Sequence, residues 1–178
     1  MRHLRRQRAL TGAGGPLIRR AVPADAVAVA DCHTLCWRDA YAGLVSDDYL
    51  YSDAVEQRRL SRWHQRLAET RAVWLAEDGG VVVGVASTDI AREHEPPGPV
   101  QLMSLYLRSA CQGTGLADRL LTAAVGSAPA FLWVFADNPR AIRFYTRHGF
   151  VADGAELVDP DTGLLEVRMV RGPREISL

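Results

Sequence analysis

The sequence contains no lysine. All 21 of its basic residues are arginine, and they balance 21 acidic residues, so the formal net charge is zero. The absence of lysine excludes a P-loop lysine, a Schiff-base lysine and a lysine general base. The zero net charge removes the bulk electrostatic attraction toward nucleic acid or an anionic membrane. We therefore expect neither nucleic acid nor a membrane as a partner.

Cysteines are few, and long apolar runs are absent. The three cysteines cannot all pair, and Cys32 and Cys36 stand at helical spacing without a metal-ligand pattern. This usage predicts no metal site and a reducing, cytoplasmic compartment. Apolar runs stay well short of the roughly 18 residues that a membrane-spanning helix needs.

The length of 178 residues fits one domain between two tails. Residues 1–16 carry four arginines and end in a glycine-rich stretch, which predicts a flexible basic tail. An arm that contacts nucleic acid is the alternative for this segment. Residues 17–171 are expected to form the single domain, and residues 172–178 a short C-terminal tail.

The hydrophobic pattern predicts an α/β domain. A turn signal, Glu77-Asp78-Gly79-Gly80, separates two apolar runs and favours a hairpin, whereas amphipathic segments between other runs favour helical crossovers. Hairpins and crossovers together predict a mixed sheet. Strands are expected at about 17–22, 72–76, 81–90, 100–107, 131–136, 151–157 and 164–170, and helices at about 23–41, 54–69, 113–125 and 139–148.

A glycine-containing turn follows the strand expected at 100–107. Gly113 and Gly115 precede an amphipathic helix, whose first-turn N–H groups and dipole favour an anion such as a pyrophosphate. A dinucleotide fingerprint fails because its last glycine position holds Asp118, and a Walker A motif fails for want of lysine. The alternative is a tight turn in which the glycines serve only the backbone geometry.

Two motifs resemble those of the GNAT superfamily of N-acyltransferases. Residues 112–117 are similar to its acyl-CoA pyrophosphate loop, Q/R-x-x-G-x-G/A, and residues 138–150 to its signature N-x-x-A-x-x-x-Y-x-x-x-G-F. The order of elements over 17–170 is similar as well. The resemblance implies a GNAT-like fold, a central mixed β-sheet flanked by helices. It also implies acetyl transfer from acetyl-CoA to an amine on a small molecule or a peptide.

The resemblance also assigns roles to residues. Tyr145 lies two helical turns after Asn138 and is implied as the general acid that protonates the leaving thiolate, although an isolated tyrosine there would be a core aromatic. A backbone N–H near Leu107 would stabilise the negative charge on the thioester oxygen. Cofactor binding is implied for Leu105, Tyr106, Leu107, Gln112, Gly113, Thr114, Gly115, Leu116, Ala117 and Asn138.

The general base is not assigned. Many relatives place a glutamate on the strand before the loop, but the aligned residue here is Gln101, which accepts no proton at neutral pH. This departure leaves open an alternative function, a catalytically weak acyl-CoA-binding sensor or regulatory module. Other candidate bases are Glu93, His94 and Glu95 in the loop before that strand, and His33 and Asp39 on the first long helix.

Residues 37–44 are similar to a W-R-x-x-Y-x-G-L stretch found in one broad group of GNAT proteins. Trp37 and Tyr41 form an i, i+4 aromatic pair that either contacts the acceptor or packs the helix on the sheet. Asp47 and Asp48 either attract a cationic amine or cap a turn. The kind of amine stays open, and a homodimer is implied only by analogy with relatives.

Overall fold

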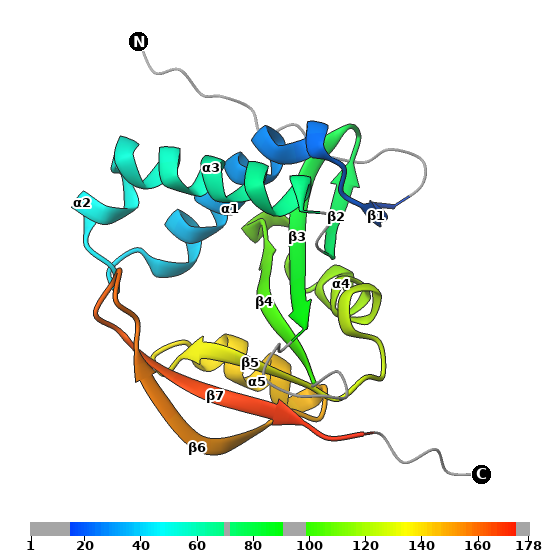
Figure 1. Cartoon of the computed structure of the whole chain (residues 1–178), viewed down its shortest axis with the longest axis vertical. Coiled ribbons are helices and arrows are strands. Elements are labelled where there is room, and N and C mark those ends of the chain that lie inside the picture. The colour runs from blue at the N-terminus through cyan, green and yellow to red at the C-terminus, as the bar shows by residue number, and fades with distance from the viewer. Residues whose placement is uncertain (1–14, 70–71, 91–98, 174–178) are drawn as a thin grey trace.

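The protein folds into a seven-stranded mixed sheet flanked by helices, which confirms the predicted α/β class (Figure 1). The computed structural model describes residues 15–69, 72–90 and 99–173, so nearly all of both expected tails lies outside it. The strand order is β1-β2-β3-β4-β5-β7-β6. The strands are β1 (Leu17–Arg20), β2 (Val73–Asp78), β3 (Val81–Ile90), β4 (Val100–Leu107), β5 (Ala130–Phe135), β6 (Val151–Val158) and β7 (Leu165–Arg171).

The helices follow the predicted pattern with two differences. The α-helices are α1 (Ala26–Tyr41), α2 (Asp47–Leu50), α3 (Asp53–Ala68), α4 (Leu116–Val125) and α5 (Pro139–Arg147), and two 3-10 turns are η1 (Pro23–Asp25) and η2 (Ser109–Cys111). The prediction missed α2, because a single turn shows no periodicity. It also started α4 three residues early, at Gly113. Gly113 and Gly115 have φ angles of 74° and 79°, which an α-helix does not accommodate.

The first four strands are covered on both faces because their apolar residues alternate between two helical layers. Val73 and Leu75 of β2 pack with α1 and α3 on one face. Ala76 of β2 and Val83 of β3 pack with α4 on the other. Among the described residues, no helix combines the length and the apolar character needed to cross a bilayer.

The sheet parts between β4 and β5, its only parallel pair. The two strands pair only where residues 100–102 face residues 130–132. Beyond Leu102, β4 pairs with β3 alone and β5 pairs with β7 (Figure 1). Ser87 pairs with Ser104 but Thr88 pairs with Leu102, so Met103 is an extra residue in β4. Such a bulge bends its strand and increases the local twist, which turns β4 away from β5.

Helix α5 is fixed beside this opening by its cap and by a link to α4. The Oδ1 atom of Asn138 accepts a hydrogen bond of 3.1 Å from the Ala141 N–H, and Pro139 follows at the first helical position. At the other end, His148 Nε2 donates to Asp118 Oδ1 at 2.8 Å. The two helices that carry the glycine turn and the tyrosine motif are therefore held together.

Candidate active site

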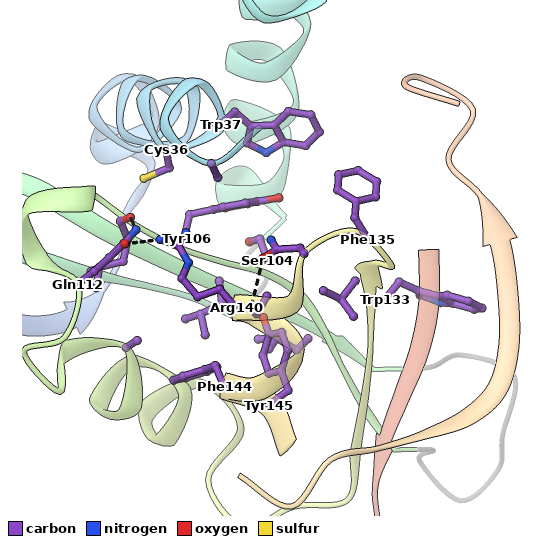
Figure 2. Close-up of a pocket in the computed structure, with 18 of the residues that line it drawn as sticks. Cys36, Trp37, Ser104, Tyr106, Gln112, Trp133, Phe135, Arg140, Phe144 and Tyr145 are labelled. Atoms are coloured by element: carbon purple, nitrogen blue, oxygen red, sulfur yellow. Dashed lines mark hydrogen bonds between the residues drawn. The ribbon is translucent and has the colours of Figure 1, made fainter. Parts of the chain in front are cut away.

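A cavity of about 720 Å³ occupies the opening between β4 and β5 (Figure 2). Its walls come from α1, β4, the glycine turn, β5, α5 and β7. It brings together most of the residues expected at the site, namely Trp37, Tyr41, Leu105, Tyr106, Leu107, Gln112, Gly113, Gly115, Ala117, Asn138 and Tyr145. Thr114 and Leu116 are not in its lining. The Thr114 hydroxyl donates to the Cys111 carbonyl at 2.7 Å, and Leu116 is buried in the core beneath α4.

The glycine turn presents its backbone to the cavity. A Cβ atom at Gly113 or Gly115 would meet nothing within 4 Å, so their positive φ angles, rather than crowding within the protein, require glycine. The first N–H groups of α4 have no acceptor within the helix, and the helix dipole makes this end positive. The turn therefore combines open space with donors suited to an anion.

Arginines at the rim of the cavity were missed from the sequence. Arg140, in the first turn of α5, donates from Nη1 to Gln112 Oε1 at 2.5 Å and lines the cavity beside the glycine turn. Arg147, the last residue of α5, also lines the cavity, and its Nη2 lies 3.7 Å from Asp118 Oδ1. The positive charge of Arg147 therefore offsets part of the negative charge of Asp118 near the turn. The spacing of seven residues between the two arginines, two turns of one helix, was the available signal.

Tyr145 belongs to the core and to the cavity at once. It is buried, and its ring makes edge-on contacts with Phe144 and Phe150 at centroid distances of 5.3 and 5.8 Å. No hydrogen bond among the described residues uses its hydroxyl group, and it lines the cavity. Burial, with the nearby Tyr41, raises the pKa of Tyr145 above the ordinary tyrosine value. The phenol therefore keeps its proton at neutral pH.

An aromatic wall from α1 faces Tyr145 across the cavity (Figure 2). Trp37 and Tyr41 contact each other at 4.8 Å between centroids, and each packs edge-on against Phe135 of β5. Burial raises the pKa of Tyr41 to about 12, and it raises the pKa of Tyr106 well above its ordinary value. This wall is therefore neutral. Arg38, the next residue of α1, does not line the cavity but links α1 to α2 and α3. Its Nε donates to the Leu50 carbonyl at 3.2 Å, and its guanidinium pairs with Glu56.

Comparisons with known proteins agree with this geometry. Residues 31–150 match the Acetyltransferase (GNAT) family. The chain belongs to the GNAT acetyltransferase family. A probable N-acetyltransferase of Mycobacterium tuberculosis is 33% identical over 77% of this chain and 80% of its own length. The GNAT relationship makes the protein an acyltransferase enzyme.

Two solved acetyltransferase structures show the same fold. The PaiA N-acetyltransferase of Thermoplasma acidophilum, solved in complex with coenzyme A, has a TM-score of 0.68 at 17% identity and covers 90% of this chain and 100% of its own. YncA of Salmonella typhimurium, solved with its cofactor acetyl-CoA, has a TM-score of 0.63 at 22% identity and covers 93% of this chain and 98% of its own.

Gln101 and the described candidates for the base, Asp39 and His33, do not line the larger cavity. Gln101 lies where β4 and β5 still pair, opposite Phe131. Asp39 is exposed and accepts a hydrogen bond from Ser109 Oγ at 2.9 Å. His33 Nδ1 accepts from Trp63 Nε1 at 3.0 Å, and burial together with the charge of Arg59 lowers the pKa of His33 well below 6.5. Glu93, His94 and Glu95 lie outside the described residues.

Glu166 of β7 is a carboxylate in the cavity that the sequence did not single out. It stands opposite Phe135 on β5, and no hydrogen bond or ion pair among the described residues uses it. Burial, and then the charge of Asp159, raise the pKa of Glu166 above 4.5. Asp159 also lines the cavity, but its Oδ1 accepts hydrogen bonds from the N–H of Asp161, and from the N–H and hydroxyl of Thr162. Of these two carboxylates, Glu166 is therefore the one whose oxygens are not used in hydrogen bonds within the described part of the protein.

No metal site accompanies these groups in the described part of the chain. No cluster of three or more histidine, cysteine, aspartate or glutamate side chains there could hold a metal ion. All three cysteines carry free, buried thiols, and Cys36 lies at the edge of the cavity on α1.

Proposed function

We propose that the protein is an N-acetyltransferase that moves the acetyl group of acetyl-CoA to an amine by direct attack in a ternary complex. The observation that carries this proposal is the single cavity that joins the glycine turn, the unpaired edge of β4 and the Tyr145 phenol. Family membership supports it, as do the fold neighbours solved with coenzyme A or acetyl-CoA.

The main chain carries most of the proposed cofactor binding. The pyrophosphate lies against the N–H groups of residues 113–117, where Thr114 and Leu116 contribute backbone rather than side chains. Arg140 adds positive charge at the rim. The pantetheine arm runs along the edge of residues 105–107, with which no strand pairs, as an added strand would; the Leu107 carbonyl there also accepts from Gln112 Nε2 at 3.4 Å. The Asn138 Oδ1 atom caps α5, and the Asn138 side chain also bonds the Tyr41 hydroxyl, which leaves one of its two amide N–H groups to donate to the cofactor.

The bond changes fit the groups around the cavity. The amine nitrogen bonds to the thioester carbon, and the carbonyl oxygen gains negative charge near the N–H groups beside Leu107. The C–S bond then breaks, and the thiolate takes the phenolic proton of Tyr145. The acylated nitrogen, which became positively charged when it bonded, gives up a proton that restores the phenol and leaves a neutral amide. Burial raises the pKa of the Tyr145 phenol, so the phenol holds its proton until the thiolate forms.

We propose that Glu166 is the general base, which accepts the proton that the ammonium must lose before it can attack. Partial burial raises the pKa of the Glu166 carboxyl, which makes its carboxylate a stronger base than that of an exposed glutamate. This assignment weakens the alternative of a sensor module, which rested on Gln101. It places the base on β7, across the opening from the strand where relatives carry their glutamate.

Gly115→Ala is expected to weaken acetyl-CoA binding about tenfold, because a residue with a Cβ resists φ near 79° and shifts the turn away from the pyrophosphate. Calorimetric titration measures this. Gly154→Ala is the matched control: Gly154 has φ of 87°, has open space around it, and lies on β6 outside the cavity. Equal affinities in the two variants would contradict the proposed role of the turn.

Tyr145→Phe is expected to lower turnover by about 10²- to 10⁴-fold, because the thiolate loses its proton donor while the core packing of the ring stays. Thiol release from acetyl-CoA measures turnover, and calorimetry should give unchanged cofactor affinity. Tyr51→Phe, at an exposed tyrosine outside the cavity, should behave like the unaltered protein. Full activity of Tyr145→Phe would remove the phenol from the mechanism.

Glu166→Gln is expected to lower kcat/KM and to flatten its pH profile. In the unaltered protein, kcat/KM should rise with pH as Glu166 loses its proton, with a midpoint above 4.5 because burial raises that pKa. The glutamine variant should lack this acidic limb, whereas Glu156→Gln, at an exposed position on β6, should keep it. An unchanged acidic limb in Glu166→Gln would exclude Glu166 as the base.

A further inference from the structure

A second cavity of about 240 Å³ adjoins the first, on the side of α1 and α3. The two cavities share the lining residues Trp37, Arg62, Met103, Ser104, Tyr106 and Asp159. The volume of the smaller cavity corresponds to about eight water molecules at about 30 Å³ each. It therefore has room for a small chemical group that extends from the main cavity, and not for a folded segment of another protein.

Arginines of α3 give the smaller cavity a positive character. Arg58, Arg59, Arg62 and Arg66 recur at helical spacing and all line it, whereas Asp159 and Asp161 are the only carboxylates among its described lining residues. Asp161 lies 3.7 Å from Arg62. Asp159 Oδ1 is occupied by hydrogen bonds within its own turn. The lining thus holds four formal positive charges against two negative ones.

Arg59 is the buried member of this set, with 8% of its surface exposed. Its Nη1 donates to the Thr34 hydroxyl at 2.8 Å, and its guanidinium carbon lies 5.4 Å from the centre of the Trp37 ring. No carboxylate among the described residues pairs with it. A guanidinium has five N–H donors and stays charged, and buried charges are normally paired. The buried charge of Arg59 therefore calls for an anion as its counter-ion.

A neutral donor stands beside Arg59. Because the Nδ1 atom of His33 accepts from the Trp63 indole, its ring proton is on Nε2. That Nε2 is buried without a hydrogen-bond partner among the described residues, and His33 lines the same cavity. The guanidinium of Arg59 and the neutral Nε2–H of His33 are suited to donate to the oxygens of a carboxylate or a phosphate. Such anions bind a guanidinium through two parallel hydrogen bonds.

We infer that the acceptor is a small amine that also carries a carboxylate or phosphate group, and that this anion pairs with Arg59 in the smaller cavity while the amine enters the larger one. The inference rests on the proposed acetyl transfer and narrows its substrate class. Of the two readings of Asp47 and Asp48, it favours a turn cap over attraction of a cationic amine, since both are exposed on α2 and line neither cavity.

The test compares matched acceptors in the thiol-release assay: each amino acid against its amide, and phosphoethanolamine against ethanolamine. At least one anionic member should exceed its neutral partner about 10- to 100-fold in kcat/KM. Arg59→Met should abolish that preference without changing the KM for acetyl-CoA, and Arg59→Lys should retain part of it. Arg143→Met, at an exposed arginine of α5 outside both cavities, should leave the preference intact.

A second readout needs no turnover. With coenzyme A present, the melting temperature is measured with a panel of N-acetyl amino acids and their amides. At least one carboxylate should stabilise the unaltered protein but not Arg59→Met, and a panel without such a ligand would overturn the inference. Acetylation that is equally efficient for neutral and anionic partners would overturn it too, while leaving acetyl transfer standing. Failure to bind acetyl-CoA would instead contradict the proposed function.

Discussion

The parting of β4 from β5 after Leu102 is the constraint on which the rest of the site depends. A continuous sheet would consume the backbone groups of residues 105–107 in pairing and would leave no space between the strands. The extra residue Met103 turns β4 away, so its edge is free and the cavity opens. Side chains from α1, α5 and β7, distant in the chain, then face one volume.

The charges around that volume are arranged in a simple order. The N-terminus of α4 and Arg140 make one end suited to anions, and the arginines of α3 do the same at the other. Between them lie the neutral aromatic wall of Trp37 and Tyr41, the protonated phenol of Tyr145 and the carboxyl of Glu166. Both ends can therefore hold charged groups while the middle stays apolar enough for the thioester and the amine to meet.

Local motifs were readable from the sequence, and long-range contacts were not. The turn at 112–117 and the Asn138 cap form within a few residues, so their glycines, proline and spacing already specify them. In the sequence, Glu166 resembles any polar residue of an alternating strand, and Arg59 resembles any charge on a solvated helix face. Only tertiary packing half-buries Glu166 and buries Arg59. The W-R-x-x-Y-x-G-L grouping, the role of the basic tail, the cytoplasmic compartment and a homodimer stay predictions.

The central claim is that main-chain N–H groups of residues 113–117 hold the pyrophosphate of coenzyme A beside the free edge of β4. Backbone amide NMR during titration with coenzyme A tests it most directly. The claim predicts that the largest chemical-shift changes fall on residues 113–117 and 105–107, with little change along β6. Saturating coenzyme A that leaves these amides unmoved, or that moves only amides elsewhere, would contradict it.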